Sequence, residues 1–140
     1  MAPVGRARMK PFKYPKLWLS VWLAAIAAVV VLSLLTLSGL PELPKGSDKL
    51  EHFLAYFLLS AAAVQLFSTQ RAHGLAAVGL IAMGIGLEFA QGAYTTQRMQ
   101  DPFDALANTL GVLAGLAVAL TPLRDLLLRF ERRLVARTPG

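Results

Sequence analysis

Four apolar segments, separated by short polar stretches, divide this sequence. The first covers residues 17–37 and has twenty-one residues without a charge. This is the length that a bilayer-spanning α-helix needs, roughly 20 residues. Three more segments follow at about 51–68, 74–94 and 102–121. We therefore predict an all-α membrane protein whose single domain, residues 17–121, is a four-transmembrane-helix bundle.

Two of these segments have an alternative interpretation. Residues 17–37 follow several basic residues, as the apolar part of a signal peptide does. That part is shorter in signal peptides, about 7–15 residues, and no A-x-A motif follows here, so we expect a retained helix. The second segment is short and contains Tyr56, Ser60 and Gln65. Taken alone it could be a helix in a soluble core, but its neighbours favour a membrane span.

The distribution of basic residues predicts the orientation. Cytoplasmic loops carry an excess of Lys and Arg. With the N-terminus inside, eleven of the fourteen basic residues fall on the inner side, and only Lys45, Lys49 and Arg98 on the outer side. We therefore predict that both termini, a basic tail at 1–16 and a second basic tail at 122–140, are cytoplasmic. Phe12, Tyr14 and Trp18 are expected at the interface.

Composition supports a membrane location. The chain is 56% hydrophobic and 16% charged, too little charge to cover a soluble domain of this size. The net charge of +6 could indicate nucleic-acid binding, but the basic residues gather at the two ends. They are better explained as topology signals and contacts to anionic lipid. The absence of cysteine excludes disulfides and cysteine-ligated metals.

The tail at 122–140 has an amphipathic pattern. Thr121 suits a helix cap and Pro122 the first helical position. The apolar positions that share one face are Leu123, Leu126, Leu127, Phe130 and Leu134. Such a helix would lie on the inner leaflet. The alternative is a simple extension of the fourth span.

Polar residues collect at the outer ends of the predicted spans. Asp48, Lys49, His52 and Tyr56 share one face at the start of the second span, because residues three and four apart are neighbours on a helix. Helix capping by Asp48 with Glu51 would explain part of this pattern. It does not explain His52 or Tyr56, and the candidate binding residues here are Lys49, His52 and Tyr56.

The third span contains a carboxylate. Glu88 and Gln91 are three residues apart and share a face. A charged side chain inside the bilayer costs on the order of 2.5–3.5 kcal/mol, and such residues usually face a partner or a water-filled cavity. We therefore predict that Glu88 is a functional residue, with a protonated or hydrogen-bonded structural Glu as the alternative.

One face of the fourth span has a stripe of residues three and four apart, which are polar at its start and glycine further along: Asp101, Asp104, Asn108, Gly111 and Gly115. Helix-start signals explain part of it, because Asp101 precedes Pro102 and an acid suits the first turn. The two glycines, four residues apart, predict close helix packing. Arg98 could pair with the acids or hold an anionic ligand.

In order and spacing, these motifs resemble the VanZ-like family over about residues 45–118. The pattern reads Asp48-Lys49-x-x-His52-Phe53-x-x-Tyr56, Glu88-x-x-Gln91 and Arg98-x-x-Asp101-x-x-Asp104-x-x-x-Asn108-Thr109-x-Gly111-x-x-x-Gly115. The family is named for a protein linked to teicoplanin resistance. The resemblance implies a multi-pass protein of the bacterial cytoplasmic membrane, and it assigns no roles to these residues.

Three functions are open at this point. The first is binding of an anionic envelope lipid or polyprenyl-linked precursor, with Lys49 and Arg98 at its head group. Further hydrogen bonds to the ligand would come from His52, Tyr56, Gln91 and Asn108. The second is a membrane enzyme, with Glu88 and His52 as general base and acid and Asp101 and Asp104 beside Glu88 as metal ligands. The third is an ion or proton pathway through Glu88. No recognised catalytic or cofactor motif is present, so no cofactor is assigned.

Overall fold

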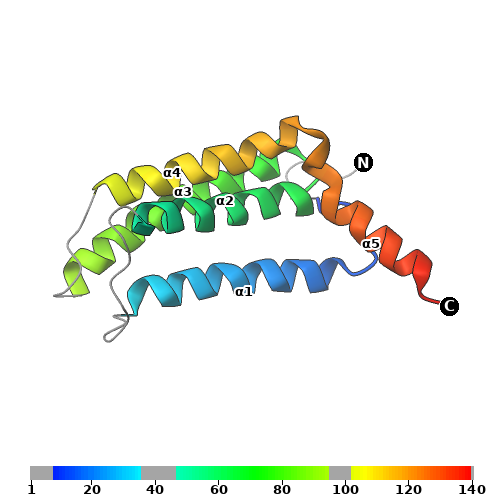
Figure 1. Ribbon diagram of the computed structural model, residues 1–140, viewed down its shortest axis with the longest axis horizontal. Helices are drawn as coiled ribbons and strands as arrows, with labels where there is room; N and C mark the ends of the chain where they lie inside the picture. The colour runs from blue at the N-terminus through cyan, green and yellow to red at the C-terminus, as the bar shows by residue number, and fades with distance from the viewer. Residues whose placement is uncertain (1–7, 36–46, 95–101, 140) are drawn as a thin grey trace.

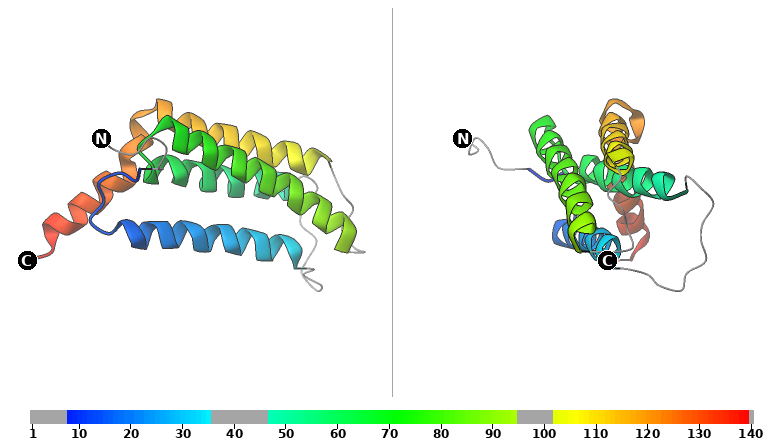
Figure 2. Two further views of the ribbon diagram at one scale, coloured as in Figure 1. Left: turned by 180° about the vertical axis from the view of Figure 1, so that it is seen from behind. Right: turned by 90° about the vertical axis from the view of Figure 1, so that its left-hand side faces the viewer.

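The computed structural model describes residues 8–35, 47–94 and 102–139, and within them all regular secondary structure is helical. Four long helices run alternately in opposite directions (Figure 1). Their bounds are Pro15–Leu34 (α1), Ser47–Leu66 (α2), Gln70–Tyr94 (α3) and Pro102–Ala117 (α4). Viewed along the bundle, α2 and α3 lie between α1 and α4 (Figure 2).

Within the described ranges, three stretches are long and apolar enough to cross a membrane. They are Pro15–Leu34, Gln70–Ala90 and Pro102–Leu120, the last of which includes a 3-10 turn, Val118–Leu120. The prediction of an all-helical chain with membrane-spanning segments is confirmed to this extent. The second predicted span, α2, stays a prediction because polar residues occupy its first turns.

Local signals explain where the helices begin, and they shift several predicted bounds. Pro15 starts α1, because its ring presets a helical backbone angle, and the helix ends at Leu34 since Leu35 is extended. The hydroxyl of Thr69 accepts a hydrogen bond from the Ala72 N–H at 3.1 Å, so α3 begins at Gln70, before the predicted residue 74. The α4 helix begins at Pro102, as predicted.

The α2 and α4 helices are in close contact because α4 has no side chains where they cross. A Cβ added to Gly111 would lie 2.3 Å from the backbone oxygen of Phe53, and one added to Gly115 would lie 2.6 Å from that of Phe57. The Ser60 hydroxyl donates a buried hydrogen bond to the Val112 carbonyl at 2.7 Å. Small residues allow this backbone approach, which favours dispersion contacts and interhelical hydrogen bonds.

The α1 helix is attached more loosely and has no fully buried residue. It contacts the core through Trp22, Ile26 and Val29, and the Trp22 indole donates to the Leu59 carbonyl at 2.9 Å. Large apolar side chains are exposed around the bundle, including Leu58, Val78 and Phe89 at 63–66%. Exposed apolar surface of this extent is typical of an interaction or membrane surface.

The C-terminal segment is a separate helix and does not extend α4. Thr121 is extended and its side chain accepts a hydrogen bond from the Leu123 N–H at 3.2 Å. A 3-10 turn, Pro122–Asp125, and the amphipathic helix α5, Leu126–Arg137, follow. The α5 helix turns away from α4 across one end of the bundle (Figure 1). The capping signal at Thr121 and Pro122 was therefore correct.

Residues 8–14, the described part of the predicted N-terminal tail at 1–16, are packed against the bundle. Backbone hydrogen bonds join the Lys10 N–H to the Leu66 carbonyl at 2.8 Å and the Ser68 N–H to the Arg8 carbonyl at 2.9 Å. Phe12 was expected at an interface, but it is 8% exposed and packs in an apolar cluster with Leu66 and Leu128. An aromatic ring that packs against two leucines is removed from both water and lipid.

Candidate functional site

The alternating helix directions bring the start of α2, the end of α3 and the start of α4 together, at the end of the bundle opposite α5 (Figure 1). Six predicted site residues are described here, and we call them the His52 cluster: Lys49, His52, Tyr56, Glu88, Asp104 and Asn108. The side chains of four further predicted residues lie outside the described residues: Asp48, Gln91, Arg98 and Asp101.

His52 is held between two residues of α4. Its Nδ1 atom lies 3.0 Å from the side-chain oxygen of Asn108, and because an amide oxygen only accepts, this contact places a proton on Nδ1. Its Nε2 atom lies 3.9 Å from an Asp104 carboxylate oxygen. Both contacts are possible because Asp104 and Asn108, four residues apart, project from the same face of α4.

Lys49 adds a positive charge to the same carboxylate. Its Nζ atom lies 3.7 Å from the other oxygen of Asp104. The lysine side chain is 41% exposed, whereas that of Asp104 is 13% exposed. A half-exposed ion pair of this length contributes little to stability. The ammonium therefore keeps access to the surroundings while Asp104 holds it beside His52.

Tyr56 and Asn108 are buried, at 2% and 3% exposed. The α3 helix covers them at Gly84, where the absence of a side chain allows its backbone to come close. A Cβ at Gly84 would lie 3.1 Å from the amide nitrogen of Asn108 and 3.2 Å from the Tyr56 ring. Sequence analysis did not single out Gly84. The available signal was its position four residues before Glu88, which places both on one face of α3.

Glu88 is 4% exposed and lies close enough to Tyr56 for an electrostatic interaction. It also lines a cavity of about 420 Å³ between α3 and α4, together with Ile85, Phe89 and Ala105. Glu88 therefore faces the inside of the bundle beside a cavity, and its functional role stays a prediction. A buried carboxylate beside a cavity is the arrangement expected of an intramembrane functional residue.

A second cavity, of about 280 Å³, lies between α1 and α2 and reaches His52 and Tyr56. Val29 and Leu32 of α1 form an apolar wall, while the polar groups of the lining come from Ser33, Glu51, His52 and Tyr56. Apolar walls with a few placed polar groups are typical of small-molecule sites. This cavity can therefore admit a ligand that is partly apolar and partly polar.

The chain matches no family model, no curated protein and no solved structure. The chemistry of the His52 cluster therefore follows from its own residues. It combines one ammonium, one oriented imidazole, two carboxylates and an amide, in contact with two cavities. These groups can bind a polar head group or transfer a proton.

The predicted metal set of Glu88, Asp101 and Asp104 includes a residue outside the described part. Among the described side chains, no group of three His, Asp or Glu could hold a metal ion. Within the cluster, Asp104 is instead placed beside a lysine and a histidine. Opposite charges beside a carboxylate favour an ion-pair role for it.

A second polar group, which sequence analysis missed, joins the N-terminal segment to α5. Lys10 is 9% exposed; its ammonium donates to the Arg124 carbonyl and lies 2.9 Å from an Asp125 carboxylate oxygen. The hydrogen bond from Lys10 lowers the pKa of Asp125 below its ordinary value of 3.8. These contacts join residues more than a hundred positions apart.

Glu131 of α5, 4% exposed, completes this group at the start of α1. Its carboxylate accepts hydrogen bonds from the N–H groups of Lys13, at 2.6 Å, and Tyr14, and from the Trp18 indole. A helix start leaves N–H groups unsatisfied and carries partial positive charge, so a carboxylate is stabilising there. The α5 helix is therefore fastened to α1.

Proposed function

We propose that this chain is a VanZ-like, four-span protein of the bacterial cytoplasmic membrane with both termini inside. Its His52 cluster, at the outward-facing end, binds the anionic head group of an envelope lipid or of a polyprenyl-linked precursor. Through that ligand the protein modulates the response of the envelope to glycopeptide antibiotics. In this proposal α2 is the fourth membrane span, enclosed by its neighbours.

The cavity between α1 and α2 carries this proposal. In this cavity His52 and Tyr56 supply polar groups, and Val29 and Leu32 supply apolar surface. A molecule with an isoprenoid chain and a polar head group needs both kinds of surface. The α1 helix has no fully buried residue, so the cavity lies behind a loosely packed helix. A lipid could therefore enter from the side, within the bilayer.

The charge that favours an anionic head group comes from Lys49. Its side chain is 41% exposed, and its ammonium lies 3.7 Å from the Asp104 carboxylate within the His52 cluster. Lysine binds phosphate as a point charge. The imidazole of His52 lies beside the same Asp104 carboxylate, at 3.9 Å, and Arg98, outside the described residues, is expected to add a second cation.

A membrane enzyme is the second candidate, and the orientation of His52 favours it. A catalytic histidine needs a partner that sets its tautomer and direction, and Asn108 is such a partner at 3.0 Å. Glu88 would then be the second proton-transfer group. If the protein is an enzyme, Glu88→Gln should still bind the lipid but lose catalytic turnover. If it is a binding protein, neither wild type nor the variant shows turnover.

Native mass spectrometry tests the first candidate. The protein is purified in mild detergent and titrated with a polyprenyl phosphate, alongside Lys49→Gln and the charge-matched control Lys45→Gln. We expect binding by wild type and by the control, and about tenfold weaker binding by Lys49→Gln, because a charged hydrogen bond contributes about 1.5–3 kcal/mol. Equal binding by all three proteins would contradict the proposal.

A further inference from the structure

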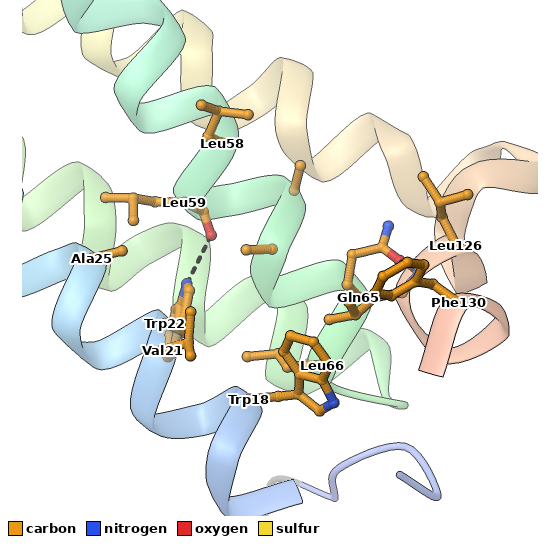
Figure 3. Close-up of a pocket in the computed structure, with 13 residues that line it drawn as sticks. Trp18, Val21, Trp22, Ala25, Leu58, Leu59, Gln65, Leu66, Leu126 and Phe130 are labelled. Carbon is orange, nitrogen blue, oxygen red and sulfur yellow. Dashed lines mark hydrogen bonds between the residues drawn. The ribbon is translucent and has the colours of Figure 1, made fainter. Parts of the chain in front are cut away.

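A groove of about 700 Å³ lies at the opposite end of the bundle from the His52 cluster, between α1, α2 and α5. Figure 3 shows that side chains of all three helices surround it. Trp18 and Trp22 of α1, Leu58 and Leu66 of α2, and Phe130 of α5 are among its lining residues. The volume lies within the roughly 300–1,000 Å³ typical of ligand sites.

The polar groups in the lining are engaged by the protein itself. The Trp22 indole donates to the Leu59 carbonyl, drawn in Figure 3, and the Trp18 indole donates to Glu131. The amide of Gln65 donates to the Leu123 carbonyl at 2.8 Å and accepts from the Leu127 N–H at 3.0 Å. The surface that remains is hydrocarbon, so the groove suits an apolar chain better than a polar ligand.

Positive charge lies at the rim. Arg133 lies about 60° around α5 from Phe130, at 3.6 residues per turn, and it is exposed. The two acids at this end are engaged elsewhere, Asp125 with Lys10 and Glu131 with the start of α1. Among the described residues, no carboxylate lies within ion-pair distance of Arg133. The Arg133 guanidinium can therefore pair with a negatively charged group from outside the chain.

We propose that this groove binds one acyl chain of an anionic phospholipid, with the phosphate held by Arg133 of α5. The apolar lining accounts for the chain and the unbalanced charge accounts for the head group. The site is separate from the proposed head-group site, which lies at the other end of the bundle. The inference requires the chain to lie in a bilayer, as the three long apolar stretches indicate.

The two tryptophans make this site directly measurable, because they are the only ones in the chain and both line the groove. The full-length protein is reconstituted into phosphatidylcholine vesicles that contain a small fraction of brominated phosphatidylglycerol or of brominated phosphatidylcholine. Brominated chains quench tryptophan fluorescence on contact. We expect stronger quenching by the anionic lipid at equal fraction and low salt.

Two matched pairs of variants separate groove binding from general lipid contact. Ala62→Phe fills the groove, whereas Ala82→Phe adds the same ring to an exposed position of α3. Arg133→Gln removes a rim charge, whereas Arg132→Gln removes the same charge about 160° around α5 from Phe130. We expect Ala62→Phe to reduce quenching, and Arg133→Gln to reduce the preference for the anionic lipid by up to about fivefold.

Equal quenching by the two lipids would overturn the proposal, because it indicates only the lipid that surrounds any membrane protein. Tryptophan fluorescence that neither brominated lipid quenches would also overturn the proposal, because a second copy or another protein would then cover the groove. The arginine pair lies on an exposed surface, so it remains informative if Ala62→Phe does not fold. If Arg133→Gln and Arg132→Gln showed the same preference for the anionic lipid, Arg133 would have no specific role in binding the phosphate.

Discussion

The Nδ1 atom of His52 and the side-chain oxygen of Asn108 lie 3.0 Å apart, across the interface of α2 and α4. This contact depends on glycines further along α4. Gly111 and Gly115 bring the two backbones close enough for a short side chain of α4 to reach a side chain of α2. The small-residue half of the α4 stripe therefore positions its polar half, and both halves serve one site.

We predict that His52 and Asn108 are energetically coupled. Removing one partner leaves the other buried without its hydrogen bond, which costs about 1–3 kcal/mol. In a double-mutant cycle with His52→Ala and Asn108→Ala, the two losses in thermal stability should therefore add to more than the loss in the double variant. Thermal unfolding in detergent measures this.

Thr109→Ala is the control for that cycle, because the Thr109 hydroxyl bonds only within α4, to the Ala105 carbonyl at 2.9 Å. Its effect should add to that of His52→Ala, as expected for independent sites. If the His52 and Asn108 effects also add, the contact does not organise the cluster.

Gly111→Ala should destabilise the bundle more than Gly79→Ala. A Cβ at Gly111 would lie 2.3 Å from a backbone oxygen, which cannot rotate away, whereas a Cβ at Gly79 would meet nothing within 4 Å. We expect a loss of about 1–3 kcal/mol for Gly111→Ala, as for an overpacked core. Gly79→Ala should be neutral or slightly stabilising. Equal effects of the two changes would mean that α2 and α4 are not in close contact.

Much of this fold was predictable because the responsible signals are local. Pro102 and Thr121–Pro122 act within one turn of the helix that they start, and the stripe from Asp104 to Gly115 depends only on helical periodicity. The spacing of Lys49 and His52 likewise placed both on one face of α2. The contacts of these two residues with Asp104 were not predicted, because the sequence offered Arg98 as the partner of the α4 acids.

The contacts at the α5 end were not predictable in this way. Lys10 was counted only among the basic topology signals and Glu131 was not singled out, because nothing in their spacing relates them to partners more than a hundred positions away. Their roles depend on how α5 lies across the bundle, which is a tertiary property. Gly84 was missed for a related reason, since its importance comes from Tyr56 and Asn108 on other helices.

Acid should weaken the attachment of α5 through Asp125. The hydrogen bond from Lys10 lowers the pKa of Asp125 in the folded protein below the ordinary value of 3.8. The resulting stabilisation is complete above the ordinary value and is lost as the pH falls below it, through the folded pKa. Asp125→Asn should therefore be less stable than wild type at pH 7, by about 1 kcal/mol or less, and the difference should begin to shrink as the pH falls below 3.8 and disappear below the folded pKa.

Tryptophan fluorescence during thermal unfolding measures this difference, because Trp18 contacts Glu131 of α5. Glu51→Gln is the control, because it removes one exposed acid at the other end of the bundle. A difference that stays constant from pH 7 to pH 3 would show that Asp125 does not act through its charge.

The orientation can be tested with single cysteines, because the chain has none of its own. Ser47 begins α2 and the exposed Gln70 begins α3, at opposite ends of the bundle. If the excess of basic residues marks the cytoplasmic side, an impermeant thiol reagent should label Ser47→Cys in intact cells. Gln70→Cys should be labelled only after the membrane is permeabilised. The reverse pattern would place the His52 cluster in the cytoplasm, where an outer-leaflet envelope precursor could not reach it.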